Sequence, residues 1–493
     1  MNTIMKRAFF LLCLIIPALV FISCEDDDPV SEPDPGKTDK NGVSIDYVNK
    51  WIHENMSVYY LWNTKIPSSR DYTLDPDDFF DSICYWYDKN HCPDGDRFSW
   101  IQEDYVDLMN SLNGVSSDEL GFDFNLYLLD EEGYLIGEIL YVKKGTQAEK
   151  EGLKRGDLFY MINNVPLSIF NYVEIFSSTK GSFSMTLVDV IEENGNSYLT
   201  PGVTLRNLTT MSSYVENPVY YSNTYSIGGK KIGYLVYNFF APDRGNNSGE
   251  YDAQLNDVFE NFKSNNVTSV VLDLRYNSGG ALSSSCILSS MLVKNLSKKE
   301  IFLKAEYNNL LTNEIKRTDG NDAFNVYFSE KVNGKTITNI GDNLEHICIL
   351  TGEYTASASE MLINGLMPYM SSEITLIGDT TIGKNVGSIT LYDEDNSKNK
   401  WGIQPIIAKF YNSAGKSDFT AGFSPEIYNP DLEINKKELG DPNEALLKEA
   451  INHITGRTTL KSKVQTNSYV QINSSLEKKA WRNTTRMDSP LRK

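Results

Sequence analysis

The spacing of apolar residues divides the chain into regions of different secondary structure. Between residues 43 and 113, apolar residues recur at intervals of three and four, which predicts amphipathic helices. The members of this pattern are Tyr47, Trp51, Ile52, Met56, Tyr59, Tyr60 and Trp62. Between residues 120 and 190, short runs at 122–128, 136–142 and 185–188 read as strands around one helix and a glycine turn at 151–157. This second region is predicted to be a small β-rich module.

Strand and helix patterns alternate from about residue 227 to residue 455. Strands are expected at 232–237, 267–274, 347–350 and 374–377, with helices near 251–263, 282–293 and 358–367. Such alternation is typical of an α/β domain with a partly parallel sheet, and ligand sites in these domains lie at the carboxyl ends of the strands. The chemistry is therefore expected in this region.

The first residues have the pattern of an export signal. Lys6 and Arg7 precede an apolar run, 8–22, that is too short to span a bilayer comfortably. The sequence Phe-Ile-Ser-Cys at 21–24 resembles a bacterial lipobox, which implies that Cys24 is lipidated and becomes the mature N-terminus. An ordinary signal peptide is the alternative. Residues 24–42 are acidic and rich in Pro and Gly, and they are predicted to be a flexible tether, with a surface-export signal and a plain spacer both open.

These patterns predict a multidomain α+β protein. The expected parts are a lipoprotein signal peptide (1–23), an acidic tether (24–42), a helical N-terminal domain (43–115), a β-rich domain (116–195), an α/β core (196–456) and a basic C-terminal tail (457–493). The tail is expected to be a mobile, solvated extension.

Composition excludes several functional classes. The chain of 493 residues has 46 basic and 66 acidic residues and a net charge of −20, which disfavours binding to nucleic acid. It has four histidines and neither an HExxH nor a CxxC motif, so we expect no metal. Outside the cytoplasm Cys84 and Cys92 could form a disulfide or stay reduced.

A serine lies where a strand is expected to turn into a helix, in the sequence LTGEYTASASEML at 350–362. At such a junction the hydroxyl of Ser357 and the following N–H groups face the same space, which suits a nucleophile beside an oxyanion site. The alternative is that Thr355, Ser357 and Ser359 only cap the helix, with Glu360 completing a capping box.

Two further segments end strands in the same domain. The sequence VVLDLRYNSGG at 270–280 ends in a glycine pair whose N–H groups could bind an anion, although an ordinary turn is the alternative. The sequence IGDTTIGKN at 377–385 places Lys384 among small residues, where a lysine is ordinarily just exposed. Together the three segments supply a hydroxyl, an amine and backbone donors, which are the parts of a serine–lysine hydrolase. Chemistry of this kind needs no cofactor.

The motifs DLRxNxGG (273–280), TASASE (355–360) and the following Gly-Lys (383–384) together resemble those of the C-terminal processing peptidases, also called tail-specific proteases. The resemblance implies that Ser357 is the nucleophile, Lys384 the general base and Glu360 a supporting group. It implies an oxyanion hole formed by the Ala358 N–H and that of Gly279 or Gly280. One position departs from the family, because Ser388 stands where a glutamine often helps to hold the lysine.

The same family resemblance identifies the β-rich module as PDZ-like. Glu119 and the following Leu120, Gly121 and Phe122 resemble a carboxylate-binding loop, and residues 145–157 resemble another PDZ stretch. Such a loop can hold a terminal carboxylate while a peptide adds as a strand to the sheet edge. A structural module without affinity for peptides is the alternative.

The predicted function is an exported serine endopeptidase, lipid-anchored in the outer membrane on its periplasmic or surface face, that cleaves protein or peptide substrates with a Ser–Lys dyad. Because a lysine with a pKa of about 10.4 is a poor base at neutral pH, the fold must lower the pKa of Lys384 by burial near residues such as Ile382. The alternatives are a non-catalytic peptide-binding lipoprotein on the same fold and a receptor or glycan-binding partner of an uptake system.

Overall fold

The structure, a computed structural model, describes residues 37–193, 196–296, 300–433, 436–457, 470–477 and 486–487. The predicted signal peptide, Cys24 and all but the end of the tether lie outside the described residues. Residues 38–493 form one compact unit. Within the described ranges no helix has the length and apolar character needed to cross a membrane.

The N-terminal region contains three α-helices, as predicted. These are α1 (Ile45–Tyr59), α2 (Pro76–Ile83) and α3 (Tyr105–Leu112). Val48, Ile52 and Met56 of α1 are fully buried, which fits the helical spacing of the sequence. Cys84 and Cys92 are both free thiols, so the disulfide that the sequence left open is not formed.

The β-rich region forms one sheet with the strand order β24-β3-β4-β5-β7-β8. The bounds are β3 (Phe122–Leu128), β4 (Leu135–Val142), β5 (Leu158–Ile162), β6 (Val165–Pro166), β7 (Ser182–Glu193), β8 (Asn196–Thr209) and β24 (Gln471–Ser474), with the helices α4 (Gln147–Lys150) and α5 (Tyr172–Ser178). Because β7 and β8 pair as a long antiparallel hairpin, the sheet continues past the predicted boundary at residue 195.

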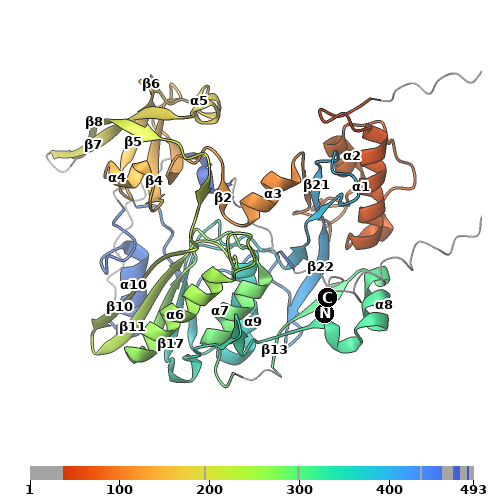
Figure 1. Cartoon of the computed structure of the whole chain (residues 1–493). Helices are drawn as coiled ribbons and strands as arrows, with labels where there is room; N and C mark the ends of the chain where they lie inside the picture. Colours follow the sequence, from red (N-terminus) through yellow and green to blue (C-terminus); the bar gives the residue numbers. More distant parts are fainter. Residues whose placement is uncertain are drawn as a thin grey trace, which may run out of the picture. The chain divides into compact units, whose positions relative to one another are not determined.

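The α/β core is built on a six-stranded sheet. Its order is β10 (Val219–Ile227), β11 (Lys230–Tyr237), β12 (Ser269–Asp273), β17 (His346–Thr351), β18 (Ile374–Gly378) and β23 (Ile427–Tyr428), and all neighbours from β11 onward are parallel. The helices α6 (Glu250–Ser264), α7 (Leu282–Leu292) and α9 (Ala358–Met370) pack on one face, and α10 (Ala445–Thr455) packs on the other (Figure 1).

Alternation along the strands decides which face each side chain covers. On β11, Leu235 and Tyr237 belong to the hydrophobic cluster of α6, α7 and α9, whereas Tyr234 and Val236 belong to the cluster of α10. Because both faces are covered by helices, these strands read as continuous apolar runs, and this made them predictable from the sequence.

A second sheet beside the core was not predicted. Its order is β14 (Asn325–Tyr327), β13 (Ile301–Tyr307), β22 (Ile406–Asn412) and β19 (Val386–Ser388). Smaller pairings and a helix complete the described strands and α-helices: β1 (Trp100–Gln102) with β21 (Gly402–Gln404) and β20 (Leu391–Tyr392), β2 (Val115–Ser116) with β9 (Tyr214–Val215), β15 (Lys331–Val332) with β16 (Lys335–Thr336), and α8 (Asn309–Thr318).

The prediction that the basic tail is a solvated extension is wrong for its described parts. Strand β24 pairs antiparallel with β3, and Leu476 just after it is only 1% exposed. Met487 is buried in the large cluster of the core. The tail binds through main-chain pairing and a few isolated apolar side chains, so its sequence shows no strong periodicity.

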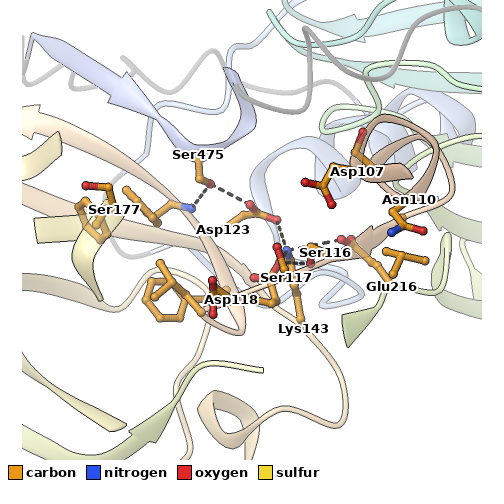
Figure 2. A pocket seen from close by; sticks show the side chains of 18 of the residues that line it. Asp107, Asn110, Ser116, Ser117, Asp118, Asp123, Lys143, Ser177, Glu216 and Ser475 are labelled. Atoms are coloured by element: carbon orange, nitrogen blue, oxygen red, sulfur yellow. Dashed lines mark hydrogen bonds and ion pairs between the residues drawn. The ribbon is translucent and has the colours of Figure 1, made fainter. Parts of the chain in front are cut away.

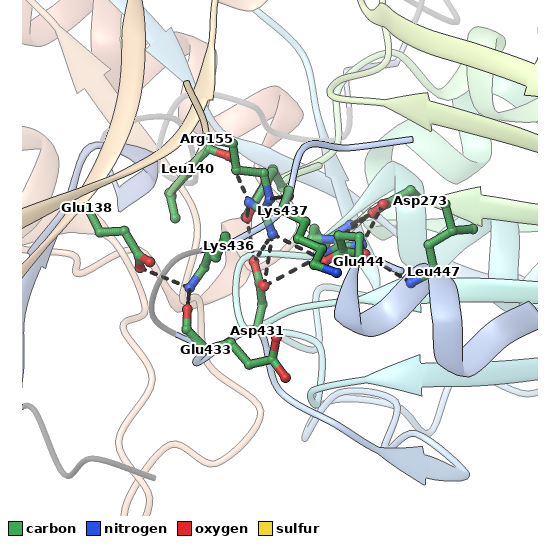
Figure 3. A network of polar contacts seen from close by, with 12 residues as sticks. Glu138, Leu140, Arg155, Asp273, Asp431, Glu433, Lys436, Lys437, Glu444 and Leu447 are labelled. Carbon is green, nitrogen blue, oxygen red and sulfur yellow. Dashed lines mark hydrogen bonds and ion pairs between the residues drawn. The ribbon is translucent and has the colours of Figure 1, made fainter. Parts of the chain in front are cut away.

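A network of buried charges joins the β-rich sheet to the core. Arg275, which follows β12, is fully buried and donates to Asp273 at 2.8 Å and to Glu444 at 2.6 Å. Arg155 of the β-rich module donates to Asp431 at 2.9 Å in the same network (Figure 3). Burial raises the pKa of Asp431, but Arg155, Lys436 and Arg275 outweigh it and hold that pKa well below its usual range. The arginine of the DLR motif is therefore a structural residue.

We expect Arg275→Met to lower the free energy of unfolding by about 3–5 kcal/mol, because it leaves the buried carboxylate of Asp273 without its arginine partner and leaves Glu444 with Arg155 alone. Urea denaturation measures this. Lys50→Met is the control, since it breaks only an exposed ion pair with Asp46 and should change stability little. Equal stability of the Arg275→Met variant and the wild type would contradict a structural role for the network.

Candidate active site

The three segments singled out in the sequence follow three adjacent parallel strands, β12, β17 and β18, and their carboxyl ends share one edge of the sheet. Ser357 is the N-cap residue of α9 and is fully buried. Its φ of 60° and ψ of −116° lie in a region that non-glycine residues rarely adopt. Such strain is common at functional sites, where the surrounding structure holds it in place.

The carboxylate of Glu360 holds the serine and lysine segments together. Oε2 accepts hydrogen bonds from the backbone N–H groups of Ser357 at 2.8 Å and Lys384 at 2.7 Å. Oε1 accepts from the Gly383 N–H at 2.6 Å and the Thr381 hydroxyl at 2.5 Å. Burial raises the pKa of Glu360 above its ordinary value, and these four donors offset only part of that rise. Since all four neighbours donate, the ionised form fits the site.

The alternative interpretation, in which these residues cap the helix, is also realised. Ser357 and Glu360 form a capping box at the start of α9. A capping box accounts for only one of the four hydrogen bonds accepted by Glu360, because the other three come from the lysine segment. The same carboxylate thus caps a helix and joins Ser357 to Lys384.

The glycine turn after β12 lies against the serine. A Cβ atom on Gly279 would come within 2.6 Å of the Ser357 Cβ, so only glycine fits beside this side chain. Asn277 links the two turns, because its carbonyl accepts from the Ala356 N–H at 3.2 Å. Its side chain accepts from the Gly279 N–H at 2.9 Å. Of the two glycines named for the oxyanion hole, Gly279 therefore already donates within the turn, which favours Gly280.

The side-chain amine of Lys384 is buried. Its side chain is 3% exposed, and within the described residues its Nζ has no hydrogen bond or ion pair. Nζ lies 4.8 Å from the centroid of the Phe98 ring. Burial lowers the pKa of Lys384 to about 7, although Asp96 and Glu360 act in the opposite direction. A lysine with this pKa exists partly as the neutral amine near pH 7, as a general base requires.

The surroundings of Lys384 include residues that sequence reasoning missed. Asp96 is fully buried and accepts from the Phe98 N–H at 2.8 Å. Arg97 donates to the carbonyls of Thr420 at 2.8 Å and Ile382 at 3.2 Å, which ties this segment to the loop of the lysine. No spacing signal links residues 96–98 to Lys384, because almost three hundred residues separate them.

Ser388, at the position where the family often has glutamine, is fully buried on β19. Its Oγ accepts a hydrogen bond from the side-chain amide of Gln404 at 3.0 Å. A glutamine from β21 therefore lies next to this position.

The loop named for peptide binding borders a cavity of about 600 Å³ lined by Leu120, Phe122 and neighbouring residues (Figure 2). The Gly121 N–H donates to Glu119 Oε1 at 3.1 Å. Buried Lys143 lies 2.5 Å from Glu119, 3.7 Å from Asp123 and 3.6 Å from Glu216. Burial lowers the pKa of Lys143, but these carboxylates outweigh it and raise that pKa. The carboxylates outnumber the single ammonium group, so the net charge beside the loop is negative.

Comparison with known proteins shows two regions of the chain that match models of one peptidase family. Residues 231–429 match the family model described as "Peptidase family S41", and residues 47–100 match the model described as "Peptidase S41 N-terminal domain". The chain carries a peptidase family S41 domain. The S41 region contains Ser357, Glu360 and Lys384, and the N-terminal match includes Asp96 and Phe98.

The chain is homologous to carboxy-terminal processing proteases. It is 22% identical to the carboxy-terminal processing protease CtpA of Bacillus subtilis and 21% identical to the chloroplastic C-terminal processing peptidase of Tetradesmus obliquus. Each match covers 59% of this chain, and 53% and 56% of the relatives, so it spans about half of their length. A crystal structure of a Bacteroides fragilis protein assigned to the S41 proteases is 27% identical with a TM-score of 0.68, covering 83% of this chain and 98% of that one.

The low pKa of Lys384 has a consequence for stability. Between pH 7 and pH 10 the folded protein has released the Lys384 proton while the unfolded chain still binds it, so the free energy of unfolding rises with pH. Lys384→Met removes this dependence. We expect the variant to be more stable than the wild type at pH 7, and the difference to shrink by on the order of 3 kcal/mol by pH 10. Urea denaturation of both proteins across this range measures it, and a constant difference would mean an ordinary lysine pKa.

Proposed function

We propose that this S41 protein is a serine endopeptidase in which Ser357 is the nucleophile and Lys384 the general base. The observation that carries the proposal is the shared Glu360 carboxylate, which binds the backbone N–H groups of both residues. It is supported by the burial of Lys384, which lowers its pKa to about 7. The substrates proposed are proteins or peptides, as the homology to processing proteases suggests.

The proposed reaction has two steps. Neutral Lys384 accepts the Ser357 hydroxyl proton as Oγ attacks a peptide carbonyl, and the N–H groups of Gly280 and Ala358 stabilise the oxyanion. The resulting ammonium gives its proton to the leaving amine, and an acyl-enzyme remains. Water then attacks the ester, and Lys384 takes a proton from that water. Lys384 passes this proton to the Ser357 Oγ as the ester bond breaks, which releases the new carboxyl terminus and restores both the serine hydroxyl and the neutral amine. These residues supply the nucleophile, the base and the oxyanion donors from the chain itself.

We also propose that the protein is exported and anchored through a lipidated Cys24 in the outer membrane, on either its periplasmic or its surface face. The support is the signal-like sequence at 1–23 and the lipobox-like residues 21–24. Metabolic labelling with a lipid precursor, with Cys24→Ala as the control, tests this part separately from catalysis.

Recognition of substrate C-termini by the PDZ-like module is the finer part of the proposal. The loop at Leu120, Gly121 and Phe122 supports it through its sequence. Two contacts compete with such a ligand: Glu119 accepts the Gly121 N–H, and β24 pairs with the edge of β3. A terminal carboxylate at this loop must displace Glu119.

The dyad predicts the effect of single and double substitutions. Because the nucleophile and base act as one unit, Ser357→Ala and Lys384→Ala should each reduce kcat by at least about a thousandfold, and the double variant should be little worse. Cleavage of an unstructured protein such as casein, followed by mass spectrometry, measures this.

Lys384→Arg is the matched variant, since it keeps the positive charge but cannot lose a proton at neutral pH. We expect it to be as inactive as Lys384→Ala. An active Lys384→Arg or Ser357→Ala variant would rule out the assigned dyad. A wild type that binds peptides but never cleaves them would instead support the non-catalytic alternative.

C-terminal recognition predicts a difference between peptide acids and amides. If the loop holds a carboxylate, peptides with a free C-terminus should have a kcat/KM about tenfold higher than their C-terminal amides, because charge-assisted hydrogen bonds are lost on amidation. Gly121→Val should remove this difference while leaving the reaction of Ser357 with a small fluorophosphonate unchanged. Equal cleavage of acids and amides would assign the module a structural role.

A further inference from the structure

Two residues of the tail, Arg486 and Met487, pair with segments that neighbour the proposed active site. Arg486 lies between two segments and forms a parallel bridge with Ala281 on one side and with Ser388 on the other. Its N–H donates to the Gly280 carbonyl at 2.9 Å, and its carbonyl accepts from the Leu282 N–H at 3.0 Å. The Met487 N–H donates to the Ser388 carbonyl at 3.0 Å. Arg486 and Met487 are thus held there by main-chain hydrogen bonds.

Both neighbours of Arg486 belong to segments that carry proposed catalytic groups. Gly280 is next to Gly279, which lies against Ser357. Ser388 ends β19, which begins two residues after Lys384. An extended peptide between these segments would run beside both members of the dyad. Peptidases commonly bind substrates in this way, through main-chain pairing that accepts many sequences.

The side chain of Met487 is buried beside the slot between Gly280–Leu282 and Ser388. Met487 is 8% exposed and packs in the core cluster that includes Phe410. A Cβ atom on Gly387 would come within 3.3 Å of the Met487 Cγ and within 2.6 Å of the Phe410 ring. The absence of a side chain at Gly387 therefore leaves room for an unbranched apolar side chain.

Strand β24 anchors the same tail nearby. Ile472 packs against the core of the β-rich sheet, and Leu476 is buried in the cluster that includes Tyr276. Ser475 Oγ also accepts from the Phe124 N–H at 2.9 Å. Because only eight residues separate Glu477 from Arg486, this anchor keeps Arg486 at a high effective concentration beside the slot.

We propose that Arg486–Met487 occupies the substrate-strand slot as an intramolecular peptide ligand, so that substrates compete with the protein's own tail. The inference rests on the proposed function, because it takes the slot beside Ser357 as the peptide site. The substrates expected from it are extended peptides in which an unbranched apolar side chain, such as that of methionine, packs beside Gly387. It also makes the tail an inhibitor that must leave before cleavage.

Displacing the tail tests the proposal by peptide binding, independently of catalysis. In a full-length Ser357→Ala background, Met487→Asp places a charge in the apolar pocket, and Arg486→Pro removes the N–H that donates to Gly280. The probe is a fluorescein-labelled peptide, Asn-Thr-Thr-Arg-Met-Asp-Ser, with the sequence of residues 483–489. Fluorescence anisotropy should show a Kd at least tenfold lower for both variants than for the Ser357→Ala parent.

Val203→Asp, which introduces the same charge at a position 60% exposed, is the matched control and should bind the probe as weakly as the parent. A probe with Asp in place of Met should bind no variant tightly. Circular dichroism verifies that each variant is folded. Met487→Asp and Arg486→Pro displace the tail in different ways, so each is an independent test. Equal probe affinity in the parent and in a folded displacing variant would overturn the proposal.

Measurements on proteins that retain Ser357 separate this inference from the proposed function. With Ser357 present, Met487→Asp should raise kcat/KM for a peptide substrate about tenfold over the wild type. If neither protein cleaves peptides or reacts with a fluorophosphonate, the proposed function fails, and the anisotropy result still decides whether the tail fills a peptide slot.

Discussion

The arrangement of the site depends on the buried carboxylate of Glu360. Each of its two oxygens accepts two hydrogen bonds, and three of the four donors come from the loop that carries Lys384. Since an unpaired buried carboxylate is costly, the loop and the start of α9 can be stable only when they are close together. This constraint also stabilises the strained backbone of Ser357, whose N–H is the fourth donor.

Burial of charge in this protein has two different outcomes. Arg275 is buried with partners, and its carboxylates keep it ionised while it joins the core sheet to α10 and the β-rich module. Lys384 is buried beside the Phe98 ring and has no such partner in the part of the chain that the structure describes, and its pKa falls to about 7. The first arrangement stabilises the fold, and the second lowers stability at neutral pH but provides a group that can accept a proton. Glu360 accepts a hydrogen bond from the backbone N–H of Lys384, so it positions this residue while the side-chain amine stays available to accept a proton.

The sequence predicted the parts of the structure that depend on local patterns. The parallel strands of the core were recognisable because both faces are buried, and Ser357, Glu360 and Lys384 were recognisable from motifs at strand ends. Contacts between distant segments were not recognisable: Phe98 reaches Lys384 from the N-terminal region, and Met487 reaches β19 from the tail. The Gly279 N–H was named as an oxyanion donor, yet Asn277 two residues earlier accepts it, which depends on a side-chain rotamer that spacing does not reveal.

The central claim is that the neutral amine of Lys384 activates Ser357, and the pH dependence of Ser357 acylation tests it most directly. The second-order rate constant for a fluorophosphonate should rise about tenfold per pH unit below pH 7 and level off above it, because the amine titrates with a pKa of about 7. Intact-protein mass spectrometry over pH 5–10 gives the rate, and peptide mapping places the label. A midpoint near pH 10, or a rate that does not change with pH, would contradict the account.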